Sequence, residues 1–169
     1  MQFSLPSAIG PVYAKLVLAG GVLLVIGLFS PSYYLSETIN GDSSSLSALG
    51  GSLADRLNAG LFSPLAGFIS LCFALICVAL PFVCERMKSA ERSRRKYVAI
   101  ASSLAGVCGL LSVVNFHSWF DLAYPEGPLF YQDASVSRGL GFGYFLVWFG
   151  VVLLFLSAYV SRGLVFEAK

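Results

Sequence analysis

The sequence predicts an all-α integral membrane protein, a four-helix transmembrane bundle formed by a single domain over residues 1–169. Three observations lead to this fold class. Hydrophobic residues make up 57% of the chain and charged residues only 12%, against about 25% in a typical soluble domain. The mean hydropathy is +0.78. The charged residues are also separated by four long gaps. This composition excludes a disordered chain, a basic nucleic-acid-binding domain and a disulfide-stapled secreted module.

Each span is predicted from a stretch that contains no Asp, Glu, Lys or Arg. These stretches cover residues 16–36, 57–84, 97–120 and 139–161. A bilayer core of about 30 Å requires about 20 apolar helical residues, because each residue adds about 1.5 Å. Trimmed at turn-forming residues, the predicted helices lie near residues 12–29, 62–83, 97–116 and 139–160. Pro31 is expected to end the first helix, and Pro64 suits the first turn of the second helix. The position of Pro31, where a cleavage site would need small residues, also argues against a cleaved signal peptide.

The distribution of charge predicts the orientation. Nine of the 11 basic residues lie beside the termini or between the second and third helices: Lys15, Arg86, Lys88, Arg92, Arg94, Arg95, Lys96, Arg162 and Lys169. The positive-inside rule therefore predicts a cell-membrane protein with both termini and the 84–96 loop in the cytosol. The basic loop (Arg86, Lys88, Arg92, Arg94, Arg95 and Lys96) is interpreted as fixing this topology. An alternative is that it docks anionic lipid or a partner.

Small residues at helical spacing indicate where the helices pack. Helices in lipid associate where such residues let their backbones approach. The predicted packing residues are Ala99, Ser102, Gly106 and Gly109 in the third helix and Gly139, Gly143 and Gly150 in the fourth. Gly139 and Gly143 form a GxxxG motif, and the first helix contributes Gly20 and Gly27. These faces are expected to meet inside the bundle or at another subunit.

The two outer loops carry distinct patterns. In the first, Leu46, Leu49, Leu53 and Leu57 follow the caps Asp42, Ser43 and Ser44, which predicts a short amphipathic helix. In the second, aromatic residues alternate with acids, which is typical of a docking surface. The predicted outer docking residues are His117, Trp119, Phe120, Tyr124, Phe130 and Tyr131. Two alternatives are a calcium site on the acids and a role for His117 in binding a quinone or a shared metal.

The predicted layout is similar in topology to that of claudin-type four-span proteins. Those proteins carry a tryptophan and a cysteine pair in the first outer loop, and residues 30–61 contain neither. The resemblance is limited to topology, so no residue role is carried over.

The chemistry of the spans argues against catalysis. Apart from Lys15 at the start of the first, they hold no Asp, Glu, Lys or Arg, which ion-coupled transporters use at membrane depth, and no cofactor or metal is expected. The predicted function is therefore a non-catalytic accessory, stabilising or assembly subunit of a membrane complex. Its expected partners are membrane lipids and other membrane subunits, in a homo- or hetero-oligomer, and not nucleic acid.

Two further functions stay open. An oligomeric pore or facilitator for a small neutral or apolar solute would be lined by Ser102, Ser103 and Ser112. An enzyme subunit that acts on lipid or quinone would use His117 and Asp121 at the outer interface.

Overall fold

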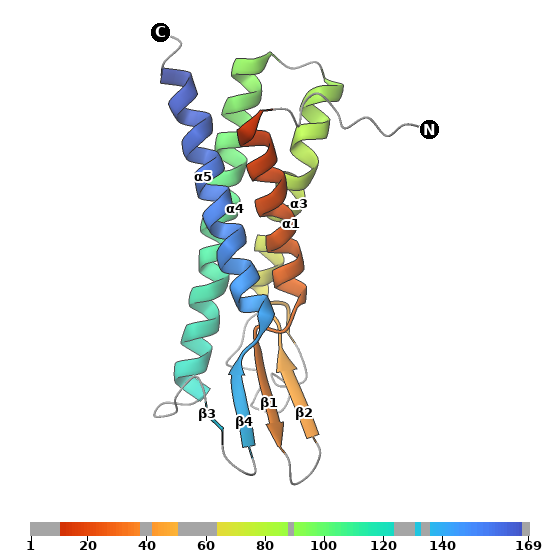
Figure 1. The fold of residues 1–169 in the computed structure, drawn as a ribbon, viewed down its shortest axis with the longest axis vertical. Helices are drawn as coiled ribbons and strands as arrows, with labels where there is room; N and C mark the ends of the chain where they lie inside the picture. The colour runs from red at the N-terminus through yellow and green to blue at the C-terminus, as the bar shows by residue number, and fades with distance from the viewer. Residues whose placement is uncertain are drawn as a thin grey trace, which may run out of the picture.

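The computed structural model describes residues 11–37, 42–50, 64–87, 90–123, 131–132 and 136–166. In chain order the elements are α1 (Val12–Phe29), β1 (Tyr33–Glu37), β2 (Asp42–Leu46), α3 (Leu65–Arg86), α4 (Glu91–Ala123), β3 (Tyr131–Gln132), β4 (Val136–Leu140) and α5 (Phe142–Phe166). The helices form an elongated bundle, and the strands lie beyond one end of it (Figure 1). We call this the sheet end. The opposite end, where α3 is followed by α4, is the connection end.

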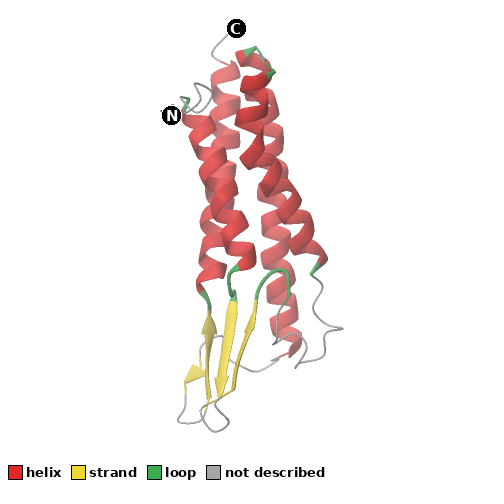
Figure 2. Ribbon diagram, turned by 90° about the vertical axis from the view of Figure 1, so that its right-hand side faces the viewer, coloured by secondary structure: helices red, strands yellow, loops and turns green. Residues whose placement is uncertain are grey.

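The helices surround one core as a closed ring. Helix α1 packs against α5 and α3, and α4 packs against the same two helices. Helices α1 and α4 run toward the sheet end and α3 and α5 run back, so every neighbouring pair is antiparallel (Figure 1). The turned view in Figure 2 also shows the strands at one end of the helices. All four described helices are long and apolar enough to cross a membrane. The predicted helical bundle is confirmed at this level.

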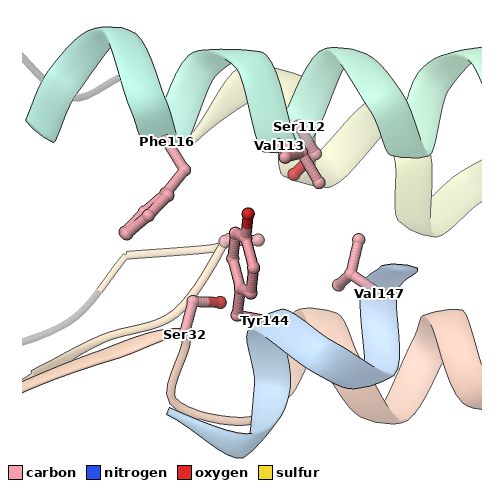
Figure 3. A pocket seen from close by; sticks show the side chains of 7 residues that line it. Ser32, Ser112, Val113, Phe116, Tyr144 and Val147 are labelled. Carbon is pink, nitrogen blue, oxygen red and sulfur yellow. The ribbon is translucent and has the colours of Figure 1, made fainter. Parts of the chain in front are cut away.

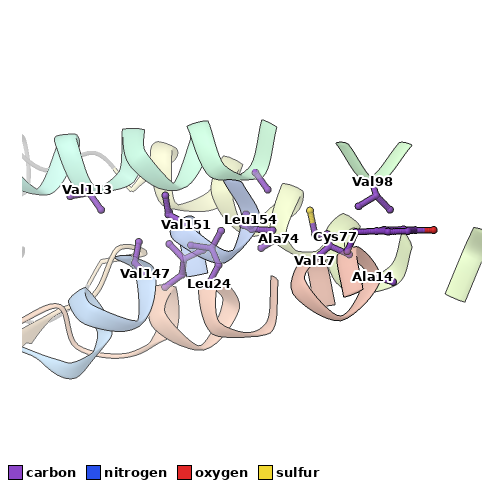
Figure 4. Close-up of a cluster of buried hydrophobic side chains, with 13 residues drawn as sticks. Ala14, Val17, Leu24, Ala74, Cys77, Val98, Val113, Val147, Val151 and Leu154 are labelled. Atoms are coloured by element: carbon purple, nitrogen blue, oxygen red, sulfur yellow. The ribbon is translucent and has the colours of Figure 1, made fainter. Parts of the chain in front are cut away.

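Apolar side chains fill the ring along its length (Figure 4). The largest contributors are Tyr13, Val17, Leu24, Leu28, Val98, Val113, Val147, Val151 and Leu154, all at most 6% exposed. Between 33% and 44% of the most apolar stretch of each helix is buried in the bundle. More than half of the residues in each stretch are therefore at least partly exposed on the surface of the bundle.

The prediction of an all-α fold is wrong at the sheet end. A four-stranded antiparallel sheet with the order β2-β1-β4-β3 lies there. Its central pair, β1 and β4, joins the two outer connections, with Tyr34 opposite Gly139. The predicted amphipathic helix fails because Asp42–Leu46 is a strand that pairs with β1, which satisfies its backbone hydrogen bonds. Leu53 and Leu57 of that prediction lie outside the described residues.

The helix boundaries differ from the predictions in three of four cases. Helix α1 matches residues 12–29, whereas α3 begins and ends three residues later than expected, and α4 extends the predicted 97–116 at both ends. Helix α5 begins at Phe142 because Gly139 still belongs to β4. The amides of Gly141 and Gly143 donate to the carbonyls of Ser32 and Pro31, so the glycine run forms a strand-to-helix joint.

Candidate functional site

Helices α1 and α5 meet through two pairs of glycines. A Cβ atom on Gly150 would lie 2.8 Å from the amide nitrogen of Leu24 and 3.0 Å from the carbonyl oxygen of Gly20. One heptad away, a Cβ atom on Gly143 would overlap the Ser30 carbonyl oxygen and lie 2.8 Å from that of Gly27. We call these pairs, Gly20 with Gly150 and Gly27 with Gly143, the glycine seam. Only hydrogen atoms fit between the two backbones here.

The predicted packing residues of α4 meet side chains instead of backbone. Gly106 faces the ring of Phe155 at 3.1–3.2 Å, and Gly109 faces a methyl group of Val151. Ala99 and Ser102 are both buried. Gly139, the remaining member of the predicted set, lies in β4 and so does not contribute to a helix contact.

Several of the described serine hydroxyls in the bundle donate to backbone carbonyls, whereas the buried hydroxyl of Ser70 has no hydrogen-bond partner among the described residues. Ser102 donates to the Val98 carbonyl at 2.5 Å and Ser103 to that of Ala99 at 2.7 Å, both one turn earlier in α4. Ser157 of α5 instead reaches across to the carbonyl of Tyr13 in α1 at 2.9 Å. Two of the three serines assigned to a pore thus bond to their own helix.

The third serine, Ser112, lines a small cavity near the sheet end (Figure 3). Its other walls are Ser32, Ala48, Val113, Phe116, Tyr144 and Val147. The space holds about one water molecule and is mostly apolar. It is too small for an organic ligand.

An aromatic cluster holds the sheet against the helices. Tyr33 of β1 is fully buried, with its ring centroid 5.4 Å from that of Phe120 and 6.2 Å from that of Phe116. These separations are typical of favourable ring pairs. His117 Nε2 and the Tyr144 hydroxyl are 2.9 Å apart, which links α4 to α5. The cluster is therefore an internal joint between sheet and bundle.

The predicted outer docking residues divide accordingly. His117 and Phe120 belong to the aromatic cluster. Because the Phe120 side chain is only 3% exposed, it is not available as a docking surface. Trp119 lies in α4 and Tyr131 in β3, while Tyr124 and Phe130 lie outside the described residues. Sequence reasoning missed Tyr33, Phe116 and Tyr144. The adjacency of Phe116 to His117 was the available signal.

A polar cluster closes the connection end. The buried Tyr13 donates its hydroxyl hydrogen to Glu91 Oε1 at 2.7 Å, and Arg95 Nε donates to the same oxygen at 3.0 Å. Arg94 lies 3.7 Å from the other carboxylate oxygen, and the Arg95 guanidinium lies 5.9 Å from the Tyr13 ring centroid. Glu91 therefore neutralises part of the basic loop internally.

The remainder of the basic loop faces outward. Arg86, Arg92 and Lys96 are exposed, and Lys88 lies outside the described residues. Within the described part of the chain, no three His, Cys, Asp or Glu side chains are placed to hold a metal ion. The expectation of no cofactor stays a prediction.

An apolar hollow separates α3 from α4 on the bundle surface, nearer the sheet end. It is lined by Leu65, Ala66 and Ile69 of α3 and by Cys108 and Leu111 of α4. The small side chains of Ala66 and Cys108 leave this space between larger neighbours.

The fold and these contacts define a class, the four-helix bundle capped at one end by a small antiparallel sheet. No protein-family model matches the chain, and no curated protein matches its sequence.

Proposed function

We propose that the chain is a multi-pass protein of the cell membrane and that α1, α3, α4 and α5 cross the bilayer. Large apolar side chains exposed on every helix support this, for example Ile26 at 47%, Ile69 at 44%, Val107 at 48% and Phe149 at 64%. In water such a surface would favour association, whereas lipid tails solvate it. The 18 residues of α1 give about 27 Å of helix, close to the bilayer core.

We further propose that the connection end faces the cytosol. The exposed basic residues of the basic loop support this orientation through the positive-inside rule. Two cysteine substitutions test it, Ser43→Cys in β2 and Ala90→Cys between α3 and α4, both at exposed positions at opposite ends. A membrane-impermeant maleimide applied to intact cells should label only Ser43→Cys, with the unsubstituted chain as background control. Labelling of both variants, or of Ala90→Cys alone, would contradict the orientation.

Within the membrane, we propose a non-catalytic role as an accessory or assembly subunit of a larger complex. The hollow between α3 and α4 is the observation that carries this proposal. Its lining is apolar and lies on helices proposed to be in the bilayer. Atoms that line an unfilled space lose dispersion contacts, so a large side chain from a neighbouring subunit would gain them.

Filling the hollow tests the subunit role. Ala66→Trp should occupy the space, whereas Val152→Trp, on an α5 position that is 56% exposed, adds the same group elsewhere. After purification in mild detergent, Ala66→Trp should lose the proteins that co-purify with the unsubstituted chain, and Val152→Trp should keep them. Equal recovery with both variants, or no stoichiometric partner at all, would contradict the proposal.

The alternatives from the sequence give different results. An oligomeric pore predicts flux of small neutral solutes into liposomes that contain the purified chain, whereas the subunit role predicts none. The hydrogen bonds of Ser102 and Ser103 to their own helix favour the subunit role. An enzyme that uses His117 predicts loss of the host complex's activity in His117→Phe, and the subunit role predicts that this activity is retained.

A further inference from the structure

Among the described residues, five exposed basic side chains lie at the connection end, with at least one on each of α1, α3, α4 and α5. They are Lys15 of α1, Arg86 of α3, Arg92 and Lys96 of α4 and Arg162 of α5. Only three of them belong to the basic loop. Lys15 and Arg162 are far from that loop in sequence, and the tertiary structure gives their depth in the bundle relative to it.

Interhelical contacts place these residues at a common level along the bundle. A Cβ atom on Gly109 of α4 would meet the side chains of both Val151 of α5 and Leu24 of α1, which gives these three helices a common level. Counted from it toward the connection end, Lys15 is nine residues away, Arg162 eleven and Lys96 13. At about 1.5 Å per residue these positions lie about 14–20 Å from that level, and Arg92 lies about 6 Å farther out than Lys96.

Helix α3 reaches the same level. A Cβ atom on Gly21 of α1 would contact the carbonyl of Ala74 and the Cβ atom of Cys77 in α3. From there Tyr13 is eight residues back along α1, and Arg86 is nine residues onward along the antiparallel α3. Both paths run about 12–14 Å toward the connection end. All four helices thus carry exposed positive charge in one zone.

The charge of this zone is not cancelled within the described residues. None of the five side chains forms an ion pair in that part of the chain. The nearby carboxylate of Glu91 is already bonded to Tyr13, Arg94 and Arg95, and Glu85 is half-buried. The positive side chains therefore face the surroundings of the bundle.

We propose that these five residues form a basic belt that binds the phosphate groups of anionic phospholipids in the leaflet around the connection end. Because the helices form a closed ring, exposed residues on all four of them point to different sides. A protein partner would cover one side, whereas lipid surrounds the bundle. Long Lys and Arg side chains also extend from within the apolar layer to the phosphate level, which accommodates the spread in depth between Lys15 and Arg92.

This inference rests on the membrane placement proposed above but not on the subunit role. Each basic residue near an anionic leaflet contributes about fivefold to binding. The test reconstitutes the full chain in vesicles of equimolar phosphatidylcholine and phosphatidylglycerol, extracts it in mild detergent and measures both retained lipids by mass spectrometry. The unsubstituted chain should retain phosphatidylglycerol in clear excess.

Two matched variants separate charge from side-chain bulk. The neutral variant carries Lys15→Gln, Arg86→Gln, Arg92→Gln, Lys96→Gln and Arg162→Gln; the charged control carries Lys15→Arg, Arg86→Lys, Arg92→Lys, Lys96→Arg and Arg162→Lys. The neutral variant should retain the two lipids nearly equally, and the charged control should behave like the unsubstituted chain. An unchanged phosphatidylglycerol excess in the neutral variant, or its loss in the charged control, would overturn the proposal.

A measurement without substitutions guards against misfolding of the neutral variant. The belt residues are exposed, so 1 M salt, which shortens the screening length to about 3 Å, should remove most of the phosphatidylglycerol excess. An excess that persists in 1 M salt would contradict the belt. Flotation distinguishes the two proposals: a chain that floats with vesicles but retains both lipids equally refutes only the belt, whereas one that floats with no vesicle refutes the membrane placement as well.

Discussion

Replacing Gly150 with alanine tests whether the backbones of α1 and α5 are in direct contact. The added methyl group would lie 2.8 Å from the Leu24 amide nitrogen, well inside the 3.4 Å at which ordinary contact begins. The atoms it meets belong to the Gly20 and Leu24 backbone, so no side-chain rotation relieves the overlap. Helix α1 must instead move away from α5 by about 0.6 Å, the difference between these two distances.

Two opposing effects set the magnitude. Inserting a group into a well-packed interior costs about 1–3 kcal/mol. Alanine also stabilises a helix by about 1 kcal/mol relative to glycine. We therefore expect Gly150→Ala to lower the free energy of unfolding by about 1 kcal/mol. Gly150→Val places two more methyl groups against the same backbone and should lower it by about 3 kcal/mol.

Gly106→Ala is the matched control. The three atoms nearest its methyl group would all belong to the ring of Phe155, at 3.1–3.2 Å, and this ring is the end of a flexible side chain that is 37% exposed. The control should be neutral or more stable by up to about 1 kcal/mol. Both variants are compared by denaturant unfolding in one detergent, followed by circular dichroism. If Gly150→Ala is as stable as Gly106→Ala, the reasoning about the glycine seam is wrong.

Three further predictions concern hydrogen bonds between helices. Tyr13→Phe removes the hydrogen bond to Glu91 and should lower the free energy of unfolding by about 1 kcal/mol. Glu91→Gln should cost less stability in the Tyr13→Phe background than in the unsubstituted chain, and equal costs in the two backgrounds would argue against the bond. His117→Phe and Tyr144→Phe should show a coupling of about 1 kcal/mol in a double-mutant cycle, and zero coupling would mean that the contact is not stabilising. Ser157→Ala leaves the Tyr13 carbonyl without its interhelical donor and should lower the midpoint of thermal unfolding, by about 1 kcal/mol in stability.

Local sequence signals predicted the helices because apolar stretches of spanning length are a property of neighbouring residues. The first span matches α1 residue for residue. The sheet had no comparable signal. Strand β1 pairs with β4, so Tyr34 lies opposite a residue more than 100 positions later, Gly139. Leu46 fits a helical spacing equally well, and only its pairing with Tyr33 makes it part of a strand.

The candidate contacts were predicted as residues but not as pairs. Gly143 and Gly150 stood out by composition, yet only the tertiary structure brings them against Gly27 and Gly20. His117 was recognised as unusual because it is the single histidine, whereas its partner Tyr144 lies on another helix. The basic loop was visible in sequence, while the belt required α1 and α5 to reach the same level.

The amino-acid sequence alone determined that this chain forms four apolar helices and that positive charge gathers at one end of them. Both properties follow from the order of apolar and charged residues, which acts over a single helix. The tertiary structure decided which glycines meet, that the two outer connections form one sheet, and how Lys15 and Arg162 lie in depth relative to the basic loop. These outcomes depend on backbone pairing and helix packing between distant segments, which no local pattern specifies.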